Sequence, residues 1–336
     1  MRVVAAPDKF RGTATAAEVA AAVGRAAATA GWDCDHVPVA DGGEGTIDAL
    51  GGANRATTVR GPLGDPVEAS WRLDRRTAVI EMAAASGLLL AGGPEANDPI
   101  AADTHGTGEL IQLAVESGAR RVIVGLGGSA TTDGGLGALR AMHPLQRYRA
   151  IDLRVACDVR TTFVDAARTF GPQKGASAAQ LRLLENRLVR LAEVYERDHG
   201  VDVRDLPRSG AAGGLAGGLA AIGAQLEDGF SLVAEEVALD ETIAGADLVV
   251  TGEGFLDDES FDGKVVGGVA ELADSLGVPV VAVVGQVLDG AGDGRSAAGE
   301  PLGVVSLSER FGQDASMADT VRCIEEALVE VLASRG

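Results

Sequence analysis

Short apolar runs near both ends of the chain constrain its fold more than any other feature. Continuous apolar runs are typical of buried strands in parallel sheets, because both faces of such a sheet are covered. The segments between them have helical length, which gives the alternation of a doubly wound α/β domain. Strands are expected at residues 3–7, 35–40, 247–251, 279–284 and 302–307, and helices at 15–30, 264–276 and 316–334. We therefore predict a Rossmann-like (flavodoxin-like) parallel-sheet domain built from both chain ends.

The middle of the chain follows a different pattern. Short strand-like runs separated by Gly, Pro and Asp turn residues are typical of an antiparallel meander. Such runs occupy residues 57–60, 67–73 and 77–82, with further strands expected at 121–125 and 153–157 and helices at 107–117 and 178–198. We expect a second α/β domain with antiparallel strands at 61–239, inserted into a domain made of 1–60 and 240–336. Two consecutive domains divided near residue 150 are the alternative.

The charge balance excludes one large class of partners. The 336-residue chain carries 49 acidic and 29 basic residues, for a net charge of −20. Nucleic-acid binding depends mostly on Lys and Arg side chains that neutralise phosphates, and an anionic membrane surface is disfavoured for the same reason. Loops and helix ends bind phosphate whatever the net charge. We therefore expect small-molecule partners, with no nucleic acid and no membrane.

The cysteines and the N-terminus favour a cytoplasmic protein. Cys34, Cys157 and Cys323 are far apart, odd in number and form no CxxC pair, which indicates neither a disulfide framework nor a zinc site. The N-terminus enters a strand-like run without a signal-peptide pattern. The uncharged stretch 210–226 is rich in glycine and poor in large apolar side chains, so we expect a closely packed internal helix or a ligand loop there.

Lysine is almost absent from the chain. Only Lys9, Lys174 and Lys264 occur, each in a short glycine-containing string. A lysine ammonium pairs with phosphate as a compact point charge, whereas arginine presents a planar fork. The three positions are therefore candidates for sites that need an ammonium, with chance survival as the alternative.

The richest glycine loop, residues 125–135, follows the strand expected at 121–125. Its glycines are interleaved with Ser129, Thr131 and Asp133. Closely spaced glycines let backbone N–H groups turn toward an anion, and the hydroxyl groups add donors. The loop matches neither a Walker A motif nor a Rossmann fingerprint. We predict an anion-binding loop, and the alternative is a structural turn.

Two acidic glycine loops follow other expected strands. In the loop 251–254, Glu253 stands between two glycines, where a carboxylate suits Mg²⁺, and Lys264 opens the next helix. A tight turn beside a solvated acidic face is the alternative there. In the loop 40–46, Asp41 and Glu44 could supply a general base and a ligand, or could cap the following helix.

Further loops add cations and a carboxylate. Residues 7–12 contain Asp8 and Arg11, residues 170–176 contain Lys174, and Asp158 closes the strand at 153–157. The four histidines form no ligand spacing. Glycine loops, several carboxylates and few lysines suit phosphoryl transfer, which relies on positioning and on stabilisation by Mg²⁺, lysine and backbone N–H groups.

Together these strings resemble the type I glycerate kinases, bacterial enzymes that phosphorylate D-glycerate with ATP and Mg²⁺. The strings occur in the family's order through nearly the whole chain. They cover residues 6–12, 40–46, 61–64, 81–88, 106–111, 127–131, 170–176, 210–215 and 251–254. The resemblance implies two α/β domains with the active site in the cleft between them.

Several segments depart from the family's pattern. The chain is shorter than the family's usual form between Gly137 and Cys157, next to the predicted anion loop. Residues 160–162 are Arg-Thr-Thr, where the family usually has Asn-Pro-Leu. Residues 259–260 are Glu-Ser, where the family often has Gln-Thr. Lys9 and Arg11 stand where the family often has serine and lysine.

On this resemblance we expect ATP-dependent phosphorylation of D-glycerate, with 2-phosphoglycerate favoured as the product. ATP and Mg²⁺ are the expected cofactors. The expected roles are catalytic for Asp8, Asp41 and Lys264, with Asp8 or Asp41 as the base; substrate binding for Arg11, Glu44 and Lys174; nucleotide or phosphate binding for Gly127, Gly128, Ser129, Thr131, Asp133, Gly252, Glu253 and Gly254; and Mg²⁺ binding for Asp158 and Glu253. The alternatives are a kinase of another small hydroxy acid and a non-catalytic nucleotide- or metabolite-binding homologue. A homodimer is left open.

Overall fold

The computed structural model describes residues 1–261, 264–288 and 302–335, which form two compact units. The first unit comprises Met1–Asp41, Asp48–Leu50 and Phe230–Gly336. The second comprises Gly42–Ile47 and Gly51–Gly229, so it is inserted between the two ends of the chain. The domain limits expected from the sequence, at 60/61 and 239/240, stay a prediction.

The sheet of the first unit is parallel throughout its described strands. Its order is β11-β10-β9-β1-β2, which is the flavodoxin-like order of a doubly wound sheet. The strands are β1 (Arg2–Ala5), β2 (Asp33–His36), β9 (Leu248–Leu256), β10 (Val280–Val287) and β11 (Gly303–Ser306). The predicted fold class is confirmed for this unit.

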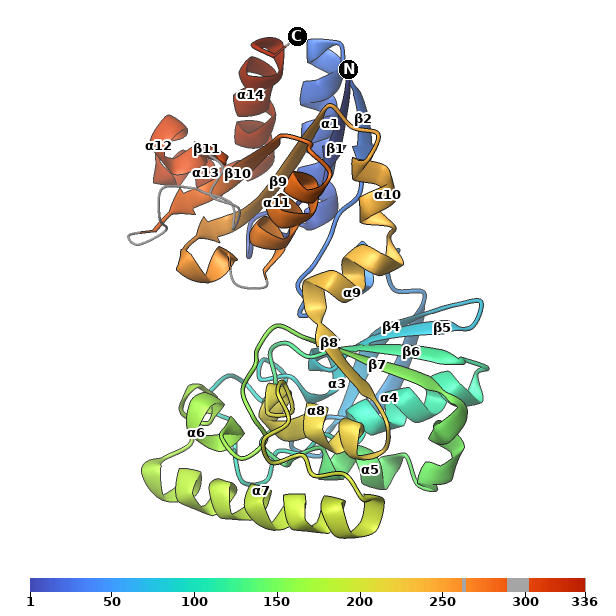
Figure 1. Ribbon diagram of the computed structural model, residues 1–336. Helices are drawn as coiled ribbons and strands as arrows, with labels where there is room; N and C mark the ends of the chain where they lie inside the picture. The colour runs from blue at the N-terminus through green and yellow to red at the C-terminus, as the bar shows by residue number, and fades with distance from the viewer. Residues whose placement is uncertain (262–263, 289–301, 336) are drawn as a thin grey trace. The chain divides into compact units, whose positions relative to one another are not determined.

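Helices cover both faces of this sheet, as its continuous apolar strands require. Val3 and Ala5 belong to one apolar cluster, whereas Val4 and Ala6 belong to another, because successive side chains of a strand point to opposite faces. Figure 1 shows α1 and α14 side by side. The first cluster includes residues of α1 (Ala16–Ala30), α12 (Leu307–Phe311) and α14 (Thr320–Ala333), and the second includes residues of α9 (Gly229–Glu236), α10 (Leu239–Ile243) and α11 (Val265–Ser275). The remaining elements here are α13 (Gln313–Ala318) and the 3₁₀ turn η3 (Asp258–Phe261). The short helix α2 (Thr46–Ala49) begins in the second unit and ends in the first.

Three expectations about local structure were wrong in detail. The predicted single helix at 316–334 is two helices, because Asp319 lies outside the helical region with φ −144° and ψ 58°. The strand predicted to end at residue 251 continues to Leu256, because its Gly252–Leu256 portion pairs with β10. The strand expected at 35–40 is β2, which begins at Asp33 opposite Arg2.

The sheet of the second unit is mixed. Its order is β3-β4-β5-β6-β7-β8, with antiparallel pairing from β3 to β5 and parallel pairing from β5 to β8. The strands are β3 (Arg55–Arg60), β4 (Pro66–Asp74), β5 (Thr77–Glu81), β6 (Arg121–Gly125), β7 (Asp152–Cys157) and β8 (Gln225–Asp228). The antiparallel meander is confirmed. The short polar strand β8 was not anticipated, because its polar residues carry no strand signal.

The helices of the second unit contribute to a single apolar cluster with the sheet. Figure 1 shows α7 as the longest helix of this unit, crossing beneath α5 and α8. The elements are α3 (Ala83–Ser86), α4 (His105–Glu116), α5 (Leu136–Ala141), α6 (Ala166–Phe170), α7 (Ala178–His199) and α8 (Ala211–Ala221), with 3₁₀ turns η1 (Leu145–Ala150) and η2 (Pro172–Lys174).

The glycine-rich segment α8 is completely buried, and its helix is interrupted by a kink at Ala212, Gly213 and Gly214, whose backbone is left-handed. The predicted closely packed internal helix is therefore confirmed only after this kink. The glycines of α8 allow a close backbone approach: a Cβ on Gly213 would lie 2.0 Å from the carbonyl oxygen of Thr131. Gly213 also has a φ of +66°, which glycine adopts without strain.

Among the described residues, none of the helices combines the length and the apolar character needed to cross a membrane.

Candidate active site

In the first unit, carboxylates gather where β1 and β9 lie next to each other. The backbone N–H of Asp8 donates to the Gly252 carbonyl at 2.9 Å, and the hydroxyl of Thr251 donates to the Ala6 carbonyl at 2.9 Å. These bonds hold the segment after β1 against the carboxyl-terminal part of β9. In this strand order, ligands bind at the point where the order reverses, which here lies between β1 and β9.

Asp8 is the most buried carboxylate of this group. Asp8 is only 8% exposed. Burial raises the pKa of Asp8 to about 6. The neighbouring Lys9 lowers that pKa and Asp41 raises it. The Oδ1 atom of Asp8 accepts a hydrogen bond from the Lys9 backbone N–H at 2.7 Å. A carboxylate with this pKa is ionised at neutral pH and close to the range of a general base.

Glu253 lies on β9 beside Asp8 and is perturbed in the same direction. Burial raises the pKa of Glu253 to about 7, while a hydrogen bond with Ser260 and the charge of Lys264 lower it. The Oε1 atom of Glu253 is buried and has no hydrogen-bond partner among the described residues. An unsatisfied buried acceptor is uncommon, and a ligand donor, a cation or a water molecule can satisfy it.

The predicted cations of this unit lie around the same strand ends. Lys264 occupies the N-cap of α11, as the sequence indicated. The preceding residues of its string, Asp262 and Gly263, lie outside the described residues. Arg11 is exposed, and its backbone nitrogen would lie 3.5 Å from a Cβ on Gly254. The charge of Arg11 also lowers the pKa of Asp8.

In the second unit, the predicted anion loop lines a cavity of about 350 Å³. Gly127, Gly128 and Ser129 form part of its lining, together with Asp158 from the end of β7 and Gln173 from η2. Asp158 is exposed. The structure therefore brings two separately predicted segments, 127–129 and 158, to one cavity within this unit.

The loop at 42–46 packs directly against this anion loop. A Cβ on Gly127 would lie 2.8 Å from the Gly43 Cα, and one on Gly42 would lie 2.7 Å from the Ala156 Cβ. Several glycines in both loops are therefore required for close packing, which supports part of the structural alternative. Glu44 is exposed on this loop.

Glu81 is a site residue that the sequence reasoning did not single out. Its Oε1 atom accepts hydrogen bonds from the N–H groups of Gly45 and Ile47, each at 2.9 Å. It thereby fixes the loop at 42–46 and the start of α2. A carboxylate directly after the apolar run of β5 was the available signal.

Lys174 and Asp133 lie behind the anion loop and support it. Lys174 is 1% exposed, its Nζ donates to the Thr131 carbonyl at 2.6 Å, and burial lowers the pKa of this lysine to about 7. Asp133 accepts hydrogen bonds from the Thr104 N–H and hydroxyl and from the N–H groups of Gly135 and Gly137. Burial raises the pKa of Asp133.

Two buried hydroxyl groups of the same loop are left without partners. The Oγ1 atoms of Thr131 and Thr132 are buried and make no hydrogen bond within the described residues. Thr131 was predicted as a phosphate-binding residue, whereas Thr132 was not. Both retain the capacity to bind a ligand, directly or through water.

The two predicted Mg²⁺ ligands belong to different units, Asp158 to the second and Glu253 to the first. Within residues 1–261, 264–288 and 302–335, no group of three or more His, Cys, Asp or Glu side chains is arranged to hold a metal.

Comparisons with known proteins agree on one family. A family model described as "Glycerate kinase family" matches residues 3–144 and 142–334. Glycerate 2-kinase of Escherichia coli (strain K12) is 42% identical, with 87% of each chain covered. Glycerate kinase of Bacillus subtilis (strain 168) is 39% identical, with 85% of each chain covered. A crystal structure described as that of a glycerate kinase 2 from Salmonella typhimurium LT2 superimposes with a TM-score of 0.85 at 34% identity, covering 100% of this chain and 98% of that one.

Proposed function

This chain belongs to the glycerate kinase family, and we propose that it transfers the γ-phosphoryl group of ATP to D-glycerate to give 2-phosphoglycerate. The observation that carries the proposal is a pair of carboxylates at the strand ends of the first unit, the buried Asp8 and the half-buried Glu253. Asp8, with a pKa of about 6, lies beside Glu253, with a pKa of about 7. Perturbed carboxylates at a ligand-binding edge of a sheet are characteristic of active sites.

Asp8 is proposed as the general base. In the transfer, the glycerate hydroxyl oxygen bonds to the γ-phosphorus of ATP while the bond from that phosphorus to the bridging oxygen breaks and ADP leaves. The hydroxyl proton passes to the carboxylate of Asp8. A base with a pKa of about 6 binds this proton more readily than an ordinary aspartate would. Asp41 helps to keep the pKa of Asp8 raised.

The phosphate groups are proposed to bind glycine-rich backbone and nearby hydroxyls. Gly127, Gly128 and Ser129 line the cavity of about 350 Å³ in the second unit. Thr131 offers a hydroxyl that has no partner among the described residues. Backbone N–H groups at closely spaced glycines bind phosphate oxygens well. In the first unit the same role is proposed for Gly252–Gly254 with Lys264.

Other predicted residues receive substrate-binding or supporting roles. Arg11 is proposed to bind the glycerate carboxylate, because it is exposed and its guanidinium matches a carboxylate in a fork geometry. Glu44 remains a proposed substrate ligand on the loop at 42–46. Lys174 and Asp133 are proposed to position the anion loop from behind, since both bond to its backbone or to adjacent residues.

Mg²⁺ fits Glu253 best among the predicted ligands. The Oε1 of Glu253, buried and without a partner among the described residues, is a hard oxygen donor of the kind that Mg²⁺ prefers. Asp158 offers an exposed carboxylate in the second unit. When bound with ATP, the ion neutralises negative charge on the phosphate groups.

A coupled ADP-release assay tests the proposed activity. D-glycerate, L-glycerate and related small hydroxy acids are supplied with ATP and Mg²⁺, and we expect turnover with D-glycerate. Preference for another hydroxy acid would transfer the proposal to that substrate, and ATP binding without any turnover would replace it with a binding function.

Phosphorus NMR of the product decides the position of transfer. In 2-phosphoglycerate the phosphorus couples to a single methine proton, whereas in 3-phosphoglycerate it couples to a methylene pair. We expect the methine pattern. A methylene pattern would contradict the proposed product and leave the kinase activity intact.

A further inference from the structure

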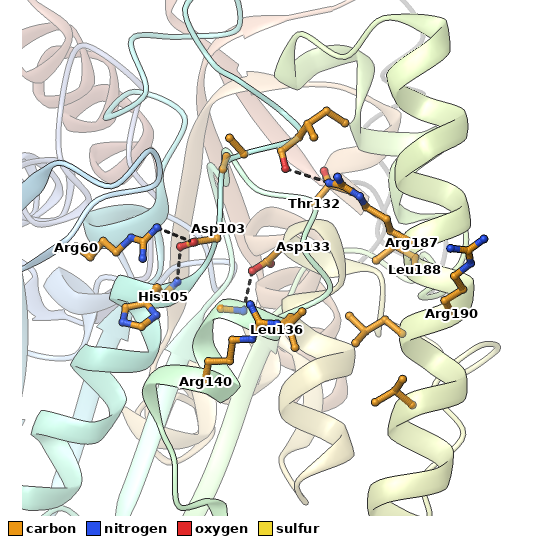
Figure 2. Close-up of a pocket in the computed structure, with 16 residues that line it drawn as sticks. Arg60, Asp103, His105, Thr132, Asp133, Leu136, Arg140, Arg187, Leu188 and Arg190 are labelled. Carbon is orange, nitrogen blue, oxygen red and sulfur yellow. Dashed lines mark hydrogen bonds and ion pairs between the residues drawn. The ribbon is translucent and has the colours of Figure 1, made fainter.

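The second unit contains another, larger cavity beside α5 and α7. Its volume is about 580 Å³, and it shares no lining residue with the smaller cavity at the anion loop. Figure 2 shows side chains from the loop before α4, from α5 and from α7 around it. Part of its wall is apolar, formed by Ile100, Leu136, Leu188, Leu191 and Val194. The cavity is therefore a separate space large enough for a small organic ligand.

Arginines dominate the polar part of this wall. Arg60, Arg140, Arg187 and Arg190 all line the cavity. Arg60 forms an ion pair with Asp103 at 3.1 Å, and Arg187 donates to the Ile100 carbonyl at 3.1 Å. In the part of the chain that the structure describes, Arg140, Arg187 and Arg190 have no carboxylate partner. In a protein with a net charge of −20, three such arginines around one cavity are a concentrated positive site.

The carboxylates of the cavity form no ion pair with Arg140, Arg187 or Arg190 among the described residues. Asp103 is paired with Arg60 and also accepts the His105 backbone N–H at 3.0 Å. Asp133 accepts hydrogen bonds from Thr104, Gly135 and Gly137. Both carboxylates are therefore engaged within the protein.

A buried hydroxyl group at the cavity provides an independent indication of a ligand. Thr132 lines the cavity and is 2% exposed, and its Oγ1 has no hydrogen-bond partner in the described residues. A buried polar group without a partner costs free energy that a ligand or a bound water can recover. Figure 2 shows Thr132 at the same side of the cavity as Arg187.

One face of α7 carries both the guanidinium groups and the apolar side chains that line the cavity. Arg187, Arg190, Leu191 and Val194 are three, four and seven residues apart, so they share one face of the helix. This face presents guanidinium groups next to apolar side chains. Across from it, α5 contributes Arg140 and Leu136.

This wall also borders the place where the chain departs from its family. The two segments matched by the family model meet at residues 142–144, directly after α5. The shortening expected between Gly137 and Cys157 falls in the same region. Arg140 therefore lies next to the segment in which the sequence predicts a departure from the family's usual length.

We propose that this cavity binds a small phosphate monoester with an apolar body, at a site separate from the cavity lined by Gly127, Gly128 and Ser129. A phosphate group has three free oxygens and close to two negative charges at neutral pH, which suits Arg140, Arg187, Arg190 and the Thr132 hydroxyl better than a two-oxygen carboxylate does. The apolar part of the ligand packs on the leucines of α5 and α7. Thr132 and Thr131 belong to the same glycine loop, so the ligand contacts that loop at Thr132, whereas Gly127, Gly128 and Ser129 line the other cavity.

Isothermal titration calorimetry with phenyl phosphate at low salt tests this site. The double variant Arg140→Gln/Arg190→Gln should weaken binding by at least about tenfold, because each arginine contributes a charged hydrogen bond. Arg182→Gln is the matched control, since Arg182 lies on α7 and does not line the cavity. The Arg182→Gln variant should bind phenyl phosphate with the same affinity as the unmodified protein.

Thr132→Val is a second variant, and it separates the effect on phenyl phosphate binding from the effect on thermal stability. It should weaken phenyl phosphate binding by about threefold to tenfold and leave the Tm unchanged or higher, because it removes a buried unpaired hydroxyl. A purely structural role for Thr132 would instead lower the Tm.

Four outcomes would overturn the proposal. Two concern phenyl phosphate itself: the unmodified protein and the double variant bind it equally well, or neither binds it. The third is benzoate binding as tight as that of phenyl phosphate, and the fourth is a KM for ATP that rises in parallel with the loss of phenyl phosphate affinity. The last would make the cavity part of the ATP site. The calorimetric result stands whether or not the protein phosphorylates glycerate.

Discussion

Buried ionisable groups gather at one place in each unit, and their surroundings differ. In the first unit, Asp8 and Glu253 have raised pKa values, and the Oε1 of Glu253 has no partner among the described residues. In the second, Asp133 accepts four hydrogen bonds and Lys174 donates to a backbone carbonyl. Both places have large pKa shifts caused by burial.

The difference shows that a perturbed pKa alone does not separate a reactive group from a supporting one. Hydrogen-bond satisfaction is the better discriminator, because a group with all its bonds made inside the protein has little capacity left for a ligand. By this criterion Glu253 is available for chemistry, whereas Asp133 maintains the loop. Substitutions in the first unit's group should therefore lower catalytic activity, whereas substitutions in the second unit's group should lower stability.

The largest effect is expected for Asp8→Asn. Loss of a general base typically lowers a rate by about 10²–10⁴-fold, so kcat for D-glycerate should fall in that range. Steady-state kinetics measure the fall, and thermal unfolding should show a Tm that is unchanged or higher, because a buried carboxylate has been removed. Asp33→Asn, at an exposed position of the same unit, is the control. Retention of kcat within about threefold in Asp8→Asn would exclude it as the base.

Lys174→Met should act mainly on stability. The substitution keeps much of the volume and leaves the Thr131 carbonyl without its donor, which should lower the free energy of unfolding by about 1–3 kcal/mol. Urea titration at neutral pH measures this loss. Arg182→Met removes an exposed cation and should change stability by less than about 0.5 kcal/mol. If Lys174→Met lost kcat without losing stability, the lysine would instead contact the substrate.

The two places should also give opposite dependences of stability on pH. Asp8 has a pKa of about 6 in the folded protein and 3.8 ordinarily. Between these values the folded state holds a proton that the unfolded chain releases, so the free energy of unfolding falls as pH rises. Lys174 has a pKa of about 7 instead of 10.5, so in that window the unfolded chain holds the extra proton and stability rises with pH.

Urea titrations across these two windows measure both slopes. Asp8→Asn should flatten the fall in the acidic window without altering the alkaline rise, and Lys174→Met should do the reverse. Identical pH profiles for the two variants would show that neither group titrates with the shifted pKa.

The smallest effects are expected from a pair of threonines in the second unit. The Thr46 hydroxyl is buried and donates to the Gly43 carbonyl at 2.7 Å, whereas the Thr131 hydroxyl is buried without a partner. Thr46→Val should destabilise by about 1 kcal/mol, and Thr131→Val should be neutral or stabilising while raising the KM for ATP. A Thr131→Val variant with unchanged KM would remove this hydroxyl from the phosphate site.

The elements that the sequence predicted well have strong local signals. Helix α1 was expected at 15–30, and its first turn is fixed by a capping box between Thr15 and Glu18. Strand β6 was expected and found at 121–125, because its apolar run ends in glycine. Strand β8 has no such signal and forms only because it pairs with β7.

The residues of the candidate site also separate into those that local sequence signals predicted and those that depend on tertiary packing. Gly127, Ser129 and Asp158 were each selected from strand-end position and residue type, and they line one cavity. Lys174 was selected for its rarity, but the direction of its ammonium depends on the packing of η2 against the loop. Glu81 was missed because its partners, Gly45 and Ile47, lie more than 30 residues away in the chain.

The α/β class, the family and the glycine loops at strand ends could be predicted from the order of the residues, because apolar runs, glycines and ordered motifs are properties of neighbouring residues. The tertiary structure alone decided which charged groups are satisfied. It buried Lys174 against Thr131 and brought Arg140 to the same cavity as Arg187 and Arg190. Within the described part of the chain, it left the Oε1 of Glu253 without a hydrogen-bond partner. Hydrogen-bond satisfaction and desolvation depend on segments that are distant in the chain, and only the folded packing sets them.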